Sequence, residues 1–119
     1  MKENNQIALE SRNFAIRIVN LYKFLIDVKK EFVMSKQILR CGTSIGANIS
    51  ESVFAQSRQD FISKLSISLK EASETKFWLD IIHETDFITD SQFESLNEDN
   101  SKLIGTLVNI INSTKKNNI

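Results

Sequence analysis

Apolar residues recur every three or four positions along most of the chain, which is the spacing of one face of an α-helix. Between about residues 8 and 28 one apolar row follows steps of four and three, and a second row lies beside it. The first row is Phe14, Ile18, Leu21, Leu25 and Val28, and the second is Ala15, Val19, Tyr22 and Ile26. Together they predict a helix over residues 8–28 with a wide apolar stripe.

A second helix is predicted over about residues 33–56, although it contains two glycines. Gly42 and Gly46 each cost about 1 kcal/mol relative to alanine in a helix interior, so a loop at CGTSIGANIS is the alternative. The apolar spacing keeps its phase across both glycines, which favours one continuous helix. The row is Met34, Ile38, Cys41, Ile45, Ile49 and Ser52.

Two further helices are predicted over residues 58–84 and 90–114. Thr89 and Gln92 have the spacing of a capping box at the start of the last helix. The row of the third helix is Phe61, Leu65, Ser68, Ala72, Thr75, Leu79 and Ile82. The row of the fourth is Phe93, Leu96, Asn100, Leu103, Leu107, Ile110 and Thr114.

The segments between these helices are short, and short loops place neighbouring helices antiparallel. The chain has 119 residues with no proline and three glycines, which suits a few long helices better than strands and turns. The sequence therefore predicts an all-α fold, a single antiparallel up-down-up-down four-helix bundle spanning residues 1–119.

The apolar stripes of the first and third helices are wider than one bundle core needs, since about three of every seven positions suffice. The residues that cannot all face one core are Ile16, Phe24, Phe77, Trp78 and Ile81. Contiguous exposed apolar surface generally marks an interface. We therefore expect a homo-oligomer with cyclic symmetry.

The Gly42-x-x-x-Gly46 pair places two small residues on one helical face, where another backbone can approach closely. Two interpretations are open at this point. The pair could serve close packing within the bundle, or it could lie at a subunit contact together with Ser44, Asn48 and Ser52.

The net charge is zero, which argues against a dedicated non-specific nucleic-acid binder. The charge is nevertheless polarised, because residues 1–40 hold eight Lys/Arg and four Asp/Glu, whereas residues 81–119 hold three and six. This asymmetry suits head-to-tail contacts or a local basic patch. Five basic residues in the first predicted hairpin could hold the phosphates of RNA, or could simply be solvated: Lys23, Lys29, Lys30, Lys36 and Arg40.

Residues suited to catalysis or metal binding are scarce. His83 is the only histidine and Cys41 the only cysteine, too few for a bundle di-metal site or a zinc site. Three carboxylates could face a cation, pair with Arg40, Lys64 or Lys70, or face water: Glu51, Glu71 and Glu74. We expect that the protein is not an enzyme and that it binds no cofactor and no metal.

The start of the chain, MKENNQIALES, lacks the apolar core of a signal peptide, and no apolar run approaches the roughly 20 residues of a membrane span. With no second cysteine, an intrachain disulfide is also impossible. We expect a cytoplasmic protein that does not contact membranes.

Three segments resemble the bacterial four-helix-bundle family known as 23S rRNA intervening-sequence proteins, sometimes labelled ribosomal-protein-like. They are FAIRIVNLYKFL, VMSKQILRCGTSIGANISES and AQSRQDFISKLSISLKEASETKFWLDII, with GTSIGANI and KEASETKFWL the most specific stretches. The resemblance covers about residues 14–115. The family is also similar to the accessory protein of diversity-generating retroelements.

The resemblance implies up-down-up-down bundles that assemble as ring-like homopentamers, some encoded within insertions in 23S rRNA genes. It also implies that retroelement relatives present a basic surface to nucleic acid and a reverse transcriptase. No enzymatic activity is assigned to the family. We therefore expect a non-catalytic oligomeric interaction module that binds itself, with binding of RNA or of a nucleic-acid-processing protein as the alternative.

Overall fold

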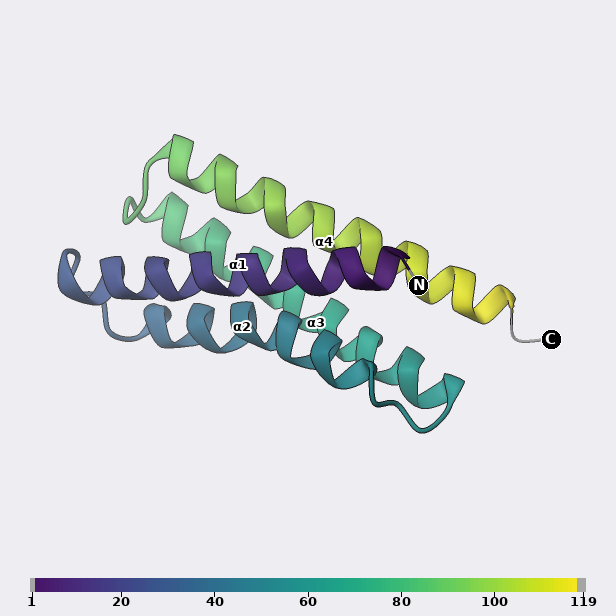
Figure 1. Ribbon diagram of the computed structural model, residues 1–119. Coiled ribbons are helices and arrows are strands. Elements are labelled where there is room, and N and C mark those ends of the chain that lie inside the picture. Colours follow the sequence, from purple (N-terminus) through teal and green to yellow (C-terminus); the bar gives the residue numbers. More distant parts are fainter. Residues whose placement is uncertain (1, 118–119) are drawn as a thin grey trace.

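The computed structural model describes residues 2–117, with side chains from residue 5 onward, and those residues contain four α-helices and no strand. The helices are α1 (Lys2–Asp27), α2 (Met34–Ser52), α3 (Arg58–Glu84) and α4 (Asp90–Lys116). Successive helices run in opposite directions, so two turns lie at one end and one turn with the termini at the other (Figure 1). The predicted all-α four-helix fold is confirmed.

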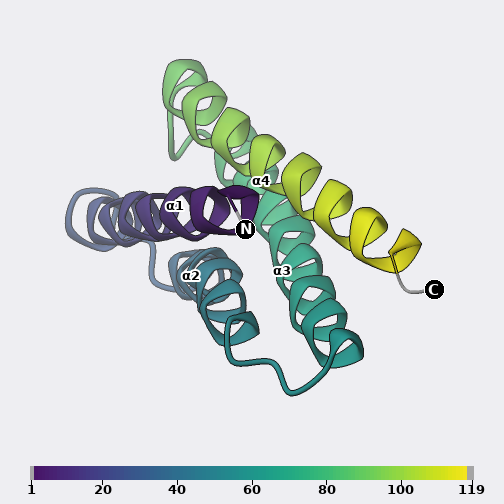
Figure 2. The ribbon, with the colours of Figure 1, turned by 45° about the vertical axis from the view of Figure 1, so that its right-hand side comes forward.

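Consecutive helices pack most closely, and α1 and α4 make the least extensive contact of the four neighbouring pairs. Figure 2 shows the axes of α1 and α4 diverging from each other. Arg17 links them, because its Nη1 lies 2.6 Å from Asp99 Oδ2 and its Nη2 donates to Ser95 Oγ at 2.8 Å. The bundle is an elongated body of 51 × 22 × 20 Å that is tightest along α1–α2–α3.

The core comes from the apolar rows that the sequence predicted, with small polar residues among them. Ile18, Leu25, Ile45 and Leu79 have no exposed surface. Ser68 is also buried, and its Oγ donates to the carbonyl of Ile45 at 2.8 Å. Hydrogen bonding to a helix carbonyl is what allows a hydroxyl to lie in this interior.

The predicted start of α1 was wrong by six residues, because the helix begins at Lys2 rather than near residue 8. The polar run before Ile7 gave no periodic signal, yet the extra turns place Ile7 in the core with 2% of its surface exposed. The predicted end was one residue late. Val28 lies beyond α1 and is exposed, although it continues the apolar row.

The predicted end of α2 at Gln56 was also wrong, since the helix ends at Ser52. Phe54 N–H donates to Glu51 O and Ala55 N–H donates to Ser52 O, so the backbone tightens into i→i−3 turns. Val53 and Phe54 are exposed and add nothing to the core. The prediction that α2 runs unbroken through both glycines is confirmed.

The bounds of α3 match the prediction, and α4 begins at Asp90 as predicted, with Thr89 and Gln92 forming both bonds of the capping box. The end of α4 was predicted two residues early, because the helix runs to Lys116. Lysines in the last turn suit the negative end of a helix, which favours this extension. The final two residues of the chain lie outside the described part.

The start of α2 depends on Glu31, whose carboxylate accepts the backbone N–H groups of Val33, Met34 and Ser35 at 2.7–3.2 Å. These amides have no partner within the helix. Replacing Glu31 with alanine should lower the free energy of unfolding by about 1–2 kcal/mol, measured by urea denaturation. Asp27→Ala, at an exposed position before the turn, is the control. Equal stability of the two variants would contradict this role.

Candidate interaction surfaces

The two glycines of α2 lie against α1 of the same chain. A Cβ built on Gly42 would lie 2.8 Å from both Cγ1 and Cγ2 of Ile18, and one on Gly46 would lie 3.2 Å from the carbonyl oxygen of Ser11. Asn48 uses its side chain within α2, donating to Ser44 O at 2.8 Å. Of the two interpretations left open by the sequence, close packing within the bundle is the one that this geometry supports for the glycines.

Arg40 joins α2 to α3 through two carboxylates. Its Nη1 lies 3.0 Å from Glu71 Oε2 and its Nη2 binds Glu74. Trp78 Nε1 also donates to Glu74 Oε2, at 3.2 Å. The hydrogen bond from Arg40 holds the pKa of Glu74 below its usual value, and Glu74 in turn raises the pKa of Arg40.

The charge of Arg40 is therefore balanced inside its own chain, whereas the four lysines with which the sequence grouped it form no ion pair with described residues. A third carboxylate also forms an ion pair, since Glu51 Oε1 lies 3.1 Å from Lys64 Nζ. These ion pairs also leave the three candidate carboxylates salt-bridged. In the described residues no group of three or more His, Cys, Asp or Glu is placed to hold a metal ion.

An apolar patch lies on the outer side of α3, next to the Arg40 ion pairs. Phe77 is 54% exposed, and Trp78 and Ile81 are half-buried. The rings of Phe77 and Trp78 meet edge to face with centroids 5.0 Å apart. The exposure of Phe77 therefore agrees with the sequence argument that these side chains cannot all enter one core, while Trp78 packs partly against it. We call Phe77, Trp78 and Ile81 the α3 patch.

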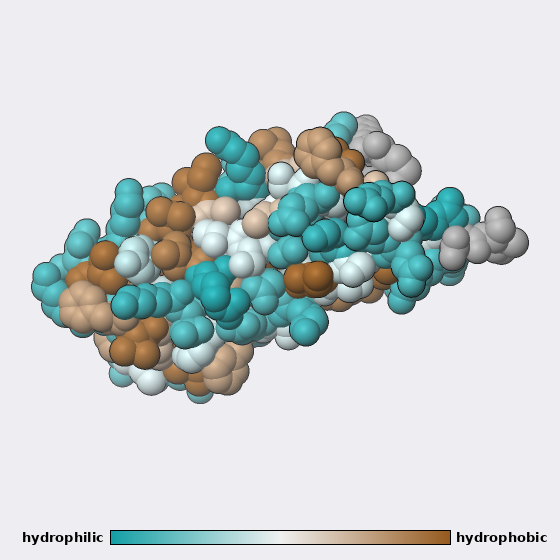
Figure 3. Space-filling view, turned by 90° about the horizontal axis from the view of Figure 1, so that it is seen from below, coloured by the Kyte–Doolittle hydropathy of each residue, from teal (hydrophilic) through white to brown (hydrophobic). Residues whose placement is uncertain are grey.

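Other apolar side chains are exposed elsewhere on the molecule. Ile16 and Leu9 are exposed on α1, whereas Phe24 is half-buried with Lys29 Nζ 5.8 Å from its ring centroid. Figure 3 shows that brown, apolar surface gathers over the half of the molecule opposite the grey C-terminal residues. That half contains the α1–α2 turn and the second half of α3 (Figure 1).

Four lysines remain as the basic surface of the first hairpin: Lys23, Lys29, Lys30 and Lys36. All four are exposed, and none forms an ion pair with another described residue. Sequence reasoning missed what accompanies them, because Val28, Phe32 and Val33 are exposed in the same turn. Only the exposure of Phe32 could have been suspected, because it lies between the two predicted helices, whereas Val28 and Val33 lie inside them.

Cys41 and His83 lie in separate surroundings. Cys41 is fully buried, and this burial raises the pKa of its thiol, which makes it a poor nucleophile. His83 stacks on Phe93 with ring centroids 4.2 Å apart, and its Nε2 lies 2.7 Å from Asp90 Oδ1. Both residues therefore have a structural role: Cys41 packs in the core, and His83 links α3 to α4.

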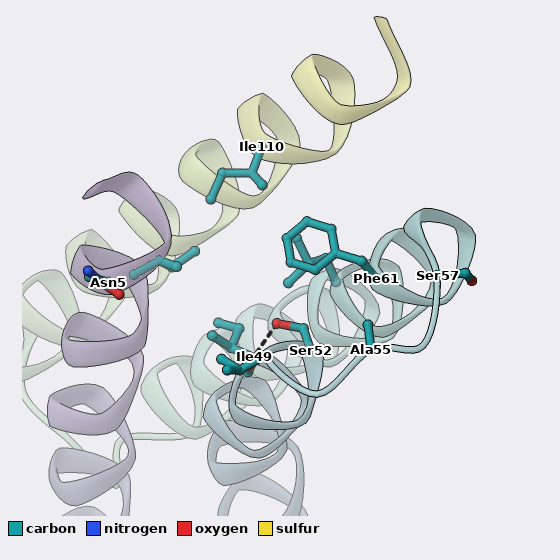
Figure 4. Close-up of a pocket in the computed structure, with 10 residues that line it drawn as sticks. Asn5, Ile49, Ser52, Ala55, Ser57, Phe61 and Ile110 are labelled. Atoms are coloured by element: carbon teal, nitrogen blue, oxygen red, sulfur yellow. Dashed lines mark hydrogen bonds between the residues drawn. The ribbon is translucent and has the colours of Figure 1, made fainter. Parts of the chain in front are cut away.

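A pocket of about 350 Å³ opens at the end of the bundle that carries the termini. Figure 4 shows the side chains of Ile49, Phe61 and Ile110 around it, from α2, α3 and α4. Ile7 of α1 and Leu65 of α3 also line it, and Ser52 Oγ donates to Ile49 O at 2.6 Å. No lining side chain is charged, so the pocket offers apolar contact and no acid–base chemistry.

The comparison with protein families decides the identity of the chain. A family model described as 23S rRNA-intervening sequence protein matches residues 3–109. The chain belongs to this family.

A solved structure agrees with that assignment. It is the 1.70 Å crystal structure of a protein with unknown function from the S23 ribosomal protein family, from Bacteroides thetaiotaomicron VPI-5482. The two chains are 56% identical with a TM-score of 0.91, over 92% of this chain and 98% of the other. No curated protein matches the chain. As for membranes, none of the helices in residues 2–117 has the length and apolarity of a spanning segment.

Proposed function

We propose that this member of the 23S rRNA-intervening sequence protein family is a non-catalytic, homo-oligomeric interaction module. The α3 patch is the observation that carries the proposal. Aromatic residues and arginine are enriched among the side chains that dominate interface energies. Here Trp78 and Arg40 are already ordered by their hydrogen bonds to Glu74, so less side-chain entropy is lost on association.

A cyclic assembly suits the distribution of charge. Ring contacts are heterologous, so the surface that one subunit offers differs from the surface that it meets. The first third of the chain is net positive and the last third net negative. We propose a ring of five on the strength of the family resemblance. The cytoplasm is the proposed compartment.

Sedimentation velocity at micromolar concentration tests the proposal. The wild-type chain should sediment as a multimer of its 13.6 kDa protomer. Phe77→Asp should give monomers, because it places a charge in the centre of the α3 patch and leaves the core untouched. Circular dichroism should show unchanged helix content in the variant.

Val108→Asp is the matched control, since Val108 is an exposed apolar residue on α4, away from the α3 patch. It should sediment as the wild type does. A monomeric wild type would overturn the proposal. An unchanged mass for Phe77→Asp would remove the α3 patch from the interface.

RNA binding is the second candidate function. It is favoured by four exposed lysines of one hairpin that form no ion pair with described residues. A ring would repeat this surface and increase affinity by avidity. Such a surface could serve RNA directly or bring a nucleic-acid-processing protein to it.

Charge reversal tests RNA binding. Wild-type affinity for a 23S rRNA fragment, measured by filter binding, should fall steeply with salt. Lys30→Glu with Lys36→Glu should lower affinity by at least about tenfold and flatten the salt dependence, because phosphate contacts are lost. Lys70→Glu with Lys102→Glu, exposed on α3 and α4, is the control pair. Equal binding by both pairs would contradict a role for this surface.

A further inference from the structure

The α1–α2 turn presents an aromatic ring on a fixed backbone. Phe32 is 54% exposed and Val33 is 72% exposed. The turn is held at two points, because Glu31 N–H donates to Leu25 O at 2.9 Å and the Glu31 carboxylate accepts three amides of α2. Lys30 adopts a φ of 55°, in the left-handed region, where the chain reverses. Phe32 is therefore held outward rather than folded onto the core.

Lysines lie close to this ring along the chain. Lys29 and Lys30 precede it in the turn, and Lys36 follows it in the first turn of α2. Two carboxylates lie in the same stretch, Asp27, which is exposed, and Glu31, which is half-buried. The carboxylate of Glu31 is engaged with the positive N-terminus of α2, and Asp27 lies before the turn, at the end of α1. Asp86 lies across a shared surface hollow from Lys29.

We propose that the α1–α2 turn binds unpaired RNA, with Phe32 stacking on a base while Lys30 and Lys36 contact the flanking phosphates. The proposal rests on the second candidate function, RNA binding, and specifies the kind of RNA that is bound. An aromatic ring between lysines is the arrangement by which proteins hold single strands. In an RNA duplex the base faces are covered by their neighbours, so a stacking side chain selects unpaired nucleotides.

The α2–α3 turn provides the matched comparison. Phe54 is 83% exposed, more than Phe32, and it lies at the opposite end of the bundle. Its turn, residues 53–57, contains no lysine or arginine, and the cations nearest to it are engaged, since Arg58 donates to the carbonyl of Asn117 and Lys64 pairs with Glu51. An aromatic ring whose neighbouring cations are bound within the chain should contribute little to RNA binding. Substitution of each phenylalanine therefore distinguishes a specific contact with nucleic acid from non-specific hydrophobic binding.

Fluorescence anisotropy with two labelled RNA probes tests the proposal. One probe is an unstructured 12-nucleotide oligomer, and the other is a hairpin with the same number of phosphates and a minimal loop. The wild type should prefer the unstructured probe. Phe32→Ala should weaken that binding by roughly five- to hundredfold and leave hairpin binding unchanged, whereas Phe32→Trp should retain it. Phe54→Ala should bind both probes as the wild type does.

The outcomes separate the proposal from the function on which it rests. If the wild type binds neither probe, RNA binding itself fails, and this inference fails with it. If both probes bind equally and Phe32→Ala changes nothing, RNA binding stands and the inference is overturned. If Phe32→Ala converts the multimer to monomers in sedimentation velocity, the ring is a subunit contact, and the inference is again overturned.

Discussion

Replacing Asn100 with aspartate is expected to lower the free energy of unfolding by about 3–5 kcal/mol at pH 7. Asn100 has no exposed surface, and its Nδ2 donates to the carbonyl of Ala72 at 3.0 Å. The side-chain oxygen has no hydrogen-bond partner among the described residues. An aspartate would face the Ala72 carbonyl without a donor, so its charged form would be buried and unpaired.

The pH dependence identifies the cause of this loss. Burial favours the neutral carboxyl, so the folded variant would bind more protons than the unfolded chain, and its stability would fall as pH rises above about 4. Below that pH the carboxyl is protonated in both states and the loss should shrink. Asn109→Asp, exposed on the same helix, should change stability by less than about 0.5 kcal/mol. A pH-independent loss in Asn100→Asp would contradict this explanation.

Gly42→Ala is expected to destabilise the protein by about 1–3 kcal/mol, although alanine is the better helix former. The new Cβ would overlap Cγ1 and Cγ2 of Ile18 at 2.8 Å. These atoms are close to the backbone of Ile18 and fully buried, so they cannot move aside without shifting α1. The steric cost therefore exceeds the gain of about 1 kcal/mol in helix propensity.

Gly105→Ala is the matched control. Gly105 is also in a helix, but a Cβ built there meets nothing within 4 Å, so the same change should stabilise by up to about 1 kcal/mol. In an Ile18→Ala background, Gly42→Ala should cost less, because the overlapping atoms are gone. Urea denaturation of the four chains of this cycle measures the coupling. Additive effects of the two substitutions would show that Ile18 is not the obstacle.

Much of the bundle could be predicted from local pattern. Residue spacing alone predicts the capping box at Thr89 and Gln92, and it also predicts that α2 is continuous. Both features depend only on residues one or two helical turns apart. The errors in the predicted helix ends lie where the hydrophobic pattern gives no information. The polar residues before Ile7 gave no reason to extend α1, and apolar Val53 and Phe54 gave no reason to end α2.

The candidate surfaces were predictable in part. The surplus of apolar side chains on the third helix was visible in the sequence, and Phe77 is indeed exposed. The sequence left open whether Glu71 and Glu74 pair with Arg40, 31 and 34 residues away, and the structure shows that they do. Helical spacing indicates which residues share a face but not which charged residue of another helix they meet.

The sequence by itself determined the number, order and direction of the helices, and it marked the third helix as carrying more apolar surface than one core can hold. Those properties depend on the 3.6-residue period and on short connections, both of which are local. The tertiary structure alone decided that Gly42 packs on Ile18, that Arg40 pairs with two carboxylates, and that Phe32 is exposed. Each of these depends on how helices pack and where their ends meet, and periodicity along one helix carries no such information.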